Sequence, residues 1–169
     1  KRQTLLFSAT MPGDILKIAS DCMRLPAVIE TAPPGTAIEL VRQEMYIVKE
    51  EMKCGFVLEL LKENTGSVLV FTRTKKGASK ITQKLKKAGI AAAEIHSDLA
   101  MHERNKSLEG FKSNKYRVLI ATDIAARGID VLGIGLVINY DLPDDASNYV
   151  HRIGRTGRAG MEGRAITLA

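Results

Sequence analysis

Residues 151–158, with the sequence HRIGRTGR, combine three arginines and two glycines in a pattern suited to binding phosphate. Arg152, Arg155 and Arg158 are spaced by three, and one helical turn would place their side chains on roughly one face. A guanidinium is always charged and offers a planar fork of donors, while the glycines let the backbone turn tightly beside a ligand. The alternative, a solvated basic stripe at a frayed helix end, does not need paired glycines. We expect the segment to stabilise a phosphoryl group during its transfer.

Residues 121–130, with the sequence ATDIAARGID, form a second candidate site. Asp123 is suited to cap a short helix, and Gly128 to supply the left-handed turn that ends it. Those structural roles leave Thr122, Arg127 and Asp130 unexplained. A threonine hydroxyl beside exposed turn amides suits a phosphate, and a carboxylate suits a sugar hydroxyl or an arginine.

A regular alternation of strands and helices, beginning near residue 40, must position these residues. Apolar strand-like runs lie at residues 41–48, 68–71, 91–95, 118–121, 136–140 and 165–168. Helical patterns lie at residues 51–63, 76–87, 101–111 and 145–153. Strands that alternate with helices of this length indicate βαβ units and a parallel sheet. The predicted fold class is therefore α/β, an open and mostly parallel sheet with helices on both faces.

Polar side chains follow four successive strands of this predicted sheet. They lie at residues 72–75, 96–98 and 122–123 and at Asp141. Ligands of open parallel sheets bind beyond the carboxyl ends of the strands. We therefore expect these side chains to line one binding edge.

The first 39 residues follow a different pattern. Residues 5–7 and 27–30 are predicted to be short strands and residues 12–24 a helix, and Pro33-Pro34-Gly35 is the clearest breaker in the sequence. The expected domain organisation is a first segment at 1–32, a linker at 33–39 and a domain at 40–169. An unpaired apolar strand at 5–7 would pair with a second copy and give a non-physiological dimer.

Composition excludes several classes of protein. No apolar run approaches the roughly 18 residues that span a bilayer and no signal peptide is recognisable, so we expect no membrane partner and a cytoplasmic location. Cys22 and Cys54 lack metal-ligand spacing and are predicted to be buried or half-buried free thiols, and no bound metal is expected. The net charge of +6 favours a polyanionic partner, and the aromatic content of 5% favours contact with phosphate over base stacking.

The sequence contains no G-x-x-x-x-G-K-[ST] phosphate loop and no acidic strand-end motif placed to hold Mg²⁺. Arginines without such a cradle cannot hydrolyse a nucleotide by themselves. We therefore expect another domain to supply the cradle.

These motifs, in this order, resemble the C-terminal, second RecA-like domain of a DEAD-box ATP-dependent RNA helicase. Residues 8–10 resemble the SAT motif at the end of the first RecA-like domain, and residues 70–74 resemble motif four. Residues 121–130 and 151–158 match motifs five and six, so the resemblance runs the whole length of the chain. It implies that the chain holds the tail of the first domain, the linker and the second domain.

The resemblance assigns a nucleotide-binding role to three residues. Arg155 and Arg158 are implied to be catalytic arginine fingers that reach the γ-phosphate of ATP, and Asp130 is implied to lie near the ATP ribose. ATP with Mg²⁺ is expected to be bound mainly by the first RecA-like domain. This chain alone is therefore expected to hold no cofactor tightly and to be inactive.

The resemblance also implies contacts with RNA. Thr74, Arg104 and Thr122 are implied to contact the RNA sugar–phosphate backbone without reading base sequence, and Gly128 to shape the same loop. Two departures from the family pattern lie nearby. Ser97 replaces the usual glycine after histidine, and Met101 replaces the usual glutamine, whose hydrogen bonds methionine cannot make.

Four residues are implied to couple the two domains: Ser8, Thr10, His151 and Arg152. In the expected mechanism, ATP and RNA draw the second domain onto the first, which bends one RNA strand and locally unwinds a short duplex. Hydrolysis of ATP then reopens the clamp.

Three other functions compete with this interpretation. They are a stand-alone RNA-binding or regulatory module, a DNA-acting helicase of the same superfamily, and a metabolic nucleotide-binding enzyme. The last predicts nucleotide affinity in the isolated chain, whereas a half-site predicts very weak affinity and no turnover.

Overall fold

The computed structural model describes residues 3–8, 11, 13–29, 40–126, 129, 131, 133–158 and 160–169. The chain divides into two compact units, Lys1–Thr36 and Ala37–Ala169. Among the predicted site residues, Thr10, Gly128 and Asp130 lie outside the described residues, and so does the whole of the predicted linker.

The first unit contains one helix, α1 (Gly13–Cys22), which lies within the helix predicted for residues 12–24. The strands predicted at residues 5–7 and 27–30 are wrong where they are described, because residues 5–7 and 27–29 adopt no strand. A strand needs a partner to satisfy its backbone groups, and the described part of this unit offers none. The dimer expected through residues 5–7 stays a prediction.

The two cysteines differ in environment. Cys54 is buried, as predicted, but Cys22 is exposed, so its predicted burial is wrong. Of the residues in α1 only Ala19 is buried, and the helix therefore offers little core in which to bury a thiol at its last position.

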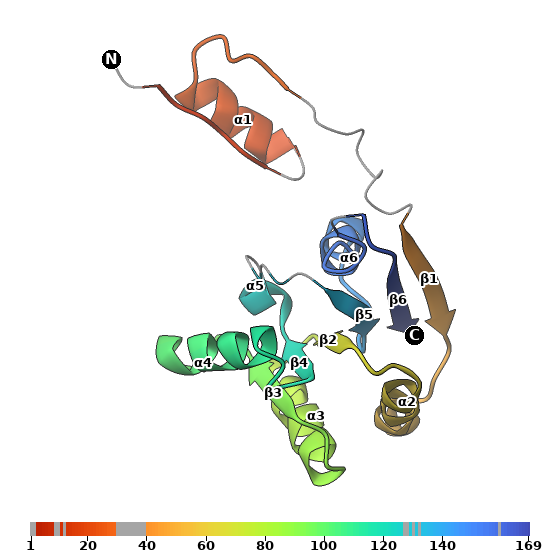
Figure 1. Ribbon diagram of the computed structural model, residues 1–169. Coiled ribbons are helices and arrows are strands. Elements are labelled where there is room, and N and C mark those ends of the chain that lie inside the picture. The colour runs from red at the N-terminus through yellow and green to blue at the C-terminus, as the bar shows by residue number, and fades with distance from the viewer. Residues whose placement is uncertain are drawn as a thin grey trace. The chain divides into compact units, whose positions relative to one another are not determined.

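The second unit is built on a six-stranded sheet in the order β1-β6-β5-β2-β4-β3 (Figure 1). The strands are β1 (Val41–Tyr46), β2 (Ser67–Phe71), β3 (Ala92–Ile95), β4 (Val118–Ala121), β5 (Ile134–Asn139) and β6 (Gly163–Leu168). Every pairing between them is parallel. The predicted fold class is confirmed, with strand limits that differ from the predicted ones by at most two residues.

Helices cover both faces of this sheet. They are α2 (Glu50–Glu63), α3 (Lys75–Lys87), α4 (Met101–Lys112), α5 (Asp123–Ala126) and α6 (Ala146–Ile153). Residues of α2 and α3 share one apolar cluster with the sheet, and residues of α4, α5 and α6 share the other. Within the described ranges, no helix combines the length and apolar character needed to cross a membrane.

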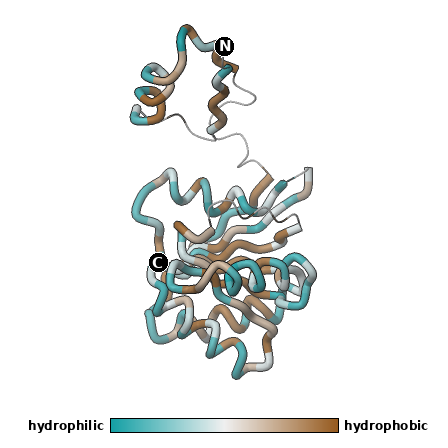
Figure 2. Tube along the Cα trace, turned by 90° about the vertical axis from the view of Figure 1, so that its left-hand side faces the viewer, coloured by the Kyte–Doolittle hydropathy of each residue, from teal (hydrophilic) through white to brown (hydrophobic). Residues whose placement is uncertain are grey.

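The central strands are apolar because both of their faces are covered. In β2, Val68 and Val70 pack toward α2 and α3, whereas Leu69 and Phe71 pack toward the opposite cluster. Figure 2 shows the same pattern as brown strands inside the second unit and teal turns around them. This core fixes the ends of β2, β4 and β5, from which the candidate site is built.

Candidate nucleotide and RNA site

The polar segments that follow the strands lie at one edge of the sheet, as predicted. All pairings are parallel, so the carboxyl ends of β2, β3, β4 and β5 meet at that edge. Hydrogen bonds across the edge join segments that are distant in sequence. The amide of Arg73, after β2, donates to the Asp141 carboxylate, after β5, at 2.8 Å.

The arginine-rich segment 151–158 leaves its helix early. Helix α6 ends at Ile153 with Gly154 as its C-cap, and a turn follows. The prediction that Arg152, Arg155 and Arg158 share one helical face is therefore wrong. The interior glycine favours ending the helix, since glycine in a helix costs about 1 kcal/mol relative to alanine.

Arg152 is buried, with 2% of its surface exposed. Its Nε and Nη2 donate to the two carboxylate oxygens of Asp123 at 2.6 and 2.7 Å, and its Nη1 donates to the carbonyl of Asp141 at 2.7 Å. The guanidinium also lies 5.2 Å from the centre of the Phe71 ring. A buried charge is tolerated only when it is paired and hydrogen-bonded, and these contacts meet that condition. Arg152 thereby joins α6 to α5 and to the ends of β2 and β5.

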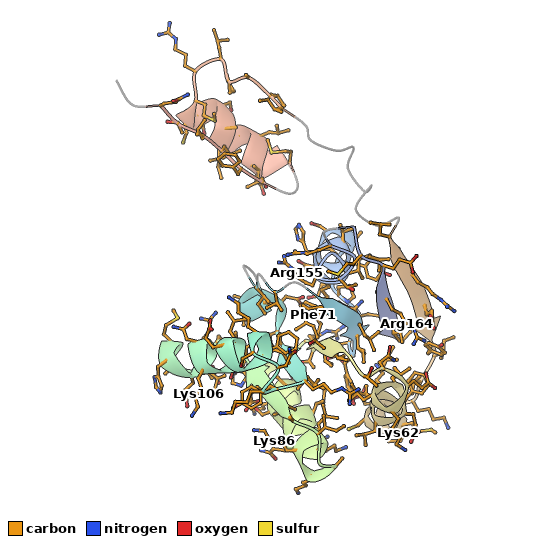
Figure 3. The ribbon with its side chains drawn as sticks, in the orientation of Figure 1. Lys62, Phe71, Lys86, Lys106, Arg155 and Arg164 are labelled. Atoms are coloured by element: carbon orange, nitrogen blue, oxygen red, sulfur yellow. The ribbon has the colours of Figure 1, made fainter. Side chains whose placement is uncertain are left out.

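Arg155 and Arg158 are half-buried and lie beside the turn. Arg155 donates from Nη1 to the carbonyl of Ile129 at 2.9 Å and from Nε to that of His151 at 3.2 Å. Arg158 donates from Nε to the carbonyl of Gly154 at 2.7 Å. Figure 3 shows Arg155 beside α6. These bonds to backbone carbonyls hold both guanidiniums against the turn.

The glycines of this turn pack against the domain itself. Gly157 has a φ of +67°, and a Cβ there would lie 2.6 Å from Cγ2 of Val41. A Cβ at Gly163 would lie 2.4 Å from the Gly157 amide nitrogen. The hydroxyl of Thr156, which is buried, donates to the carbonyl of Ile134. Internal packing thus requires glycine at position 157, and its approach to a ligand stays a prediction.

Two of the residues predicted to bind RNA follow neighbouring strands, β2 and β4. Thr74 caps α3 by accepting from the Gly77 amide at 3.0 Å, and its hydroxyl hydrogen can still be donated to an acceptor. Thr122 is half-buried at the start of α5, directly before the Asp123 that pairs with Arg152. The β2–β4 pairing continues to Thr72, whose amide donates to the Ala121 carbonyl at 2.9 Å.

Arg104, the third predicted RNA contact, lies on α4. Its side chain is half-buried, and within the described residues its buried Nε has no hydrogen-bond partner. Met101 begins the same helix with 66% of its surface exposed, and Ser97 is exposed in the loop before it. A long, exposed residue at position 101 is thus placed one helical turn before Arg104.

The residues predicted to couple the domains fall in different surroundings. His151 is half-buried on α6, and Ser8 is exposed in the first unit. The donors of Arg152 are used within the second unit. Among the described residues no group of three histidine, cysteine, aspartate or glutamate side chains could hold a metal ion.

Sequence reasoning placed Asp141 at this edge but not its hydrogen-bond partners, and it missed Asn139. Asn139 is fully buried. Its Oδ1 accepts a hydrogen bond from Arg152 Nη1 at 3.4 Å, and its Nδ2 donates to the Thr167 hydroxyl at 3.1 Å. The sequence did hold a signal for Asn139, because it is the one polar residue at the end of the apolar strand β5. Asp123 was assigned only to helix capping, although its main partner is Arg152.

Comparison with known protein families is consistent with this geometry. The family model for the helicase conserved C-terminal domain matches residues 52–160. The chain belongs to this family. The match includes the strand ends, Arg152, Arg155 and Arg158, so the arginine-rich turn is part of the helicase C-terminal domain.

Individual relatives are DEAD-box and other ATP-dependent RNA helicases. The chain is 42% identical over 169 residues to the ATP-dependent RNA helicase DbpA of Bacillus subtilis (strain 168), which covers 99% of this chain and 35% of DbpA. It matches the C-terminal domain of the DEAD-box protein Dbp5 with a TM-score of 0.70 and 38% identity over 78% of each chain. It also matches S. cerevisiae Dbp5 bound to RNA and ADP BeF3, with a TM-score of 0.84 and 33% identity over 96% of this chain and 44% of that one.

The helicase C-terminal domain described here is thus RecA-like, a parallel six-stranded sheet with helices on both faces. The chain spans less than half the length of the curated relatives that it matches.

Proposed function

We propose that this chain is the C-terminal part of an ATP-dependent RNA helicase, in which it binds the RNA backbone and supplies arginine fingers to ATP held on a first RecA-like domain. One observation carries the proposal. The turn with Arg155 and Arg158 and the loops with Thr74 and Thr122 lie at one edge of the sheet, joined through Arg152.

Arg155 and Arg158 fit a nucleotide polyphosphate by their chemistry. Both are half-buried, so their charge is less screened than on open surface, and each is held by a backbone carbonyl. ATP with Mg²⁺ supplies the phosphoryl group and its leaving group when it is bound on the partner domain. The two guanidiniums stabilise charge on that group as the domains close.

The RNA side of the edge uses hydroxyls and one further arginine. Thr74 and Thr122 offer hydroxyls that can donate to phosphate oxygens, and Arg104 adds a guanidinium from α4. Such contacts recognise the sugar–phosphate backbone, so binding should be independent of base sequence and should weaken as salt rises. The RNA in the Dbp5 structure, which has the same fold at a TM-score of 0.84, supports this assignment.

Mixing this chain with a separately made first RecA-like domain and measuring RNA-stimulated ATPase tests the proposal. We expect Arg155→Ala and Arg158→Ala each to lower kcat about 10²-fold or more, because loss of one charge-stabilising donor costs roughly 3 kcal/mol in the transition state. Arg42→Ala is the matched control, since Arg42 is an exposed arginine on β1 and should leave kcat unchanged.

Finger variants that matched wild-type activity would contradict the assignment. Equal stimulation by DNA of the same sequence would instead identify a helicase that does not select RNA.

A further inference from the structure

The turn after β5 receives hydrogen bonds from three other elements. We call residues 140–142 the junction turn. Lys53 Nζ of α2 donates to the carbonyl of Tyr140 at 3.2 Å, and Arg152 Nη1 of α6 donates to the carbonyl of Asp141 at 2.7 Å. The backbone amide of Arg73, between β2 and α3, donates to the Asp141 carboxylate at 2.8 Å. The junction turn therefore connects the two segments to which different ligands are assigned.

The side chain of Asp141 fixes the loop that carries Thr74. The Arg73 amide is the residue's only backbone donor, and its acceptor is a carboxylate, which makes a stronger bond than a neutral oxygen. The Arg73 side chain returns to the same turn, with Nη2 3.3 Å from the Leu142 carbonyl. Its Nε lies 3.7 Å from the exposed carboxylate of Asp144. Within its own segment, the Thr74 carbonyl also accepts from the Thr72 hydroxyl at 3.1 Å and from the Ala78 amide at 3.0 Å. The Asp141 carboxylate adds the bond that ties the Arg73 backbone to the turn after β5.

The backbone of Asp141 fixes a different segment. Its carbonyl accepts from Arg152, whose other donors grip both carboxylate oxygens of Asp123. Asp123 directly follows Thr122. The carboxylate of Asp141 therefore supports the loop that carries Thr74. Its carbonyl supports Arg152, which binds the Asp123 that follows Thr122.

We propose that Asp141 is a positioning residue for RNA binding, whose carboxylate holds the Arg73 amide so that Thr74 is presented in register with Thr122. Asp141 itself contacts neither RNA nor nucleotide. This inference rests on the proposed function, because the ligands of Thr74 and Thr122 are those assigned there.

Loss of the carboxylate should affect the RNA step far more than the chemical step. Without the bond to Asp141, the backbone at Arg73 must be ordered when RNA binds, which lowers the affinity for RNA. The carbonyl of Asp141 survives any side-chain substitution, so Arg152 and the turn with Arg155 and Arg158 keep their support. The two ligand sites should therefore respond differently to one substitution.

The experiment compares Asp141→Ala, Asp141→Asn and Asp144→Ala in the full-length helicase, by RNA-stimulated ATPase and by hydrogen exchange of the Arg73 amide. Asp141→Ala should raise the RNA concentration for half-maximal ATPase about tenfold, speed exchange of that amide, and keep kcat at saturating RNA and KM for ATP within twofold. Asp141→Asn retains an oxygen acceptor and should restore most of the RNA affinity. Asp144→Ala should match wild type, since that carboxylate is 77% exposed.

Asp141→Ser, whose short side chain cannot reach the amide, replaces the alanine variant if the latter does not fold. RNA dependence unchanged in the variant lacking the acceptor overturns the positioning role, and so does an equal loss of kcat and of RNA affinity in all Asp141 variants. An RNA-stimulated wild type with inactive finger variants keeps the proposed function standing in either case. A wild type that RNA does not stimulate overturns both.

Discussion

Arg152 illustrates how a single residue in a functional motif can serve the fold. Its guanidinium is buried and makes a bidentate ion pair with Asp123, and it lies over the ring of Phe71. The bidentate geometry requires the planar fork of arginine, which lysine cannot reproduce. The three-residue spacing predicted a basic face, but it could not reveal that the first arginine points into the domain.

Gly157 carries a prediction at the residue scale. Gly157→Ala should destabilise the domain by about 2–4 kcal/mol, because alanine at positive φ costs roughly 1–2 kcal/mol and its Cβ would also meet Val41 at 2.6 Å. Urea unfolding followed by circular dichroism measures the change.

Gly133→Ala separates the two causes, since Gly133 has a φ of +76° and a Cβ there would have no neighbour within 4 Å. Gly133→Ala should lower the free energy of unfolding only by the roughly 1–2 kcal/mol that alanine costs at positive φ. Equal losses in the two variants would show that the contact with Val41 contributes nothing.

At the scale of elements, edge strand β1 is attached to β6 by charge as well as by backbone pairing. The Glu44 carboxylate accepts hydrogen bonds from Nε and Nη2 of Arg164, both at 2.9 Å, and from the Tyr46 hydroxyl at 2.8 Å. These hydrogen bonds, led by that of Arg164, lower the pKa of Glu44 from 4.5 to about 2. The carboxylate therefore stabilises the fold above pH 4.5, and its contribution disappears as the pH falls toward 2.

Glu44→Gln should lower the free energy of unfolding by about 1 kcal/mol at pH 7, a modest value because solvent screens a partly exposed pair. The difference from wild type should shrink between pH 4.5 and pH 2, as followed by thermal unfolding across that range. Glu109→Gln is the control, because its exposed partner Lys112 lies 3.8 Å away. A difference that stays constant down to pH 2 would refute the ionic origin.

For the second unit, the sequence predicted where the strands and helices lie in the chain better than it predicted which strands pair with one another. Unbroken apolar runs located β2 and β4 to within a residue, because a strand covered on both faces has no polar side. Apolar runs carry no record of strand order, so the insertion of β6 between β1 and β5 was not predictable. The strand predicted at residues 5–7 was wrong because an apolar run does not show whether a second strand is present to pair with it.

The candidate site was predictable where it depends on position in the sheet. Thr74 and Thr122 were found because they follow strands whose carboxyl ends meet at one edge. Asp141 also follows such a strand, but its role arises from a bond to a backbone amide 68 residues away in sequence. Neither spacing nor residue type signals such a contact.

At the scale of the whole molecule, the groups that we propose to contact the nucleotide form only part of a site within the described residues. Arg155 and Arg158 offer charge, but the sequence has no phosphate loop whose amides could enclose a polyphosphate. We therefore expect isothermal titration calorimetry to detect no micromolar binding of ATP to this chain alone, and no turnover. Addition of a first RecA-like domain should produce both. Micromolar affinity in the isolated chain would contradict the assignment of a half-site.

The position of β6 constrains how the domain is made. Among the described strands, β1 is bonded only to β6, which follows the other five strands in the sequence. A nascent chain that has emerged only as far as β5 can assemble β5, β2, β4 and β3. The backbone hydrogen-bonding groups of β1 stay unpaired until β6 is present. Gly163, which admits no side chain beside Gly157, lies at the start of that late strand. Completion of the sheet and closure of the arginine-rich turn should therefore occur together, once β6 has been synthesised.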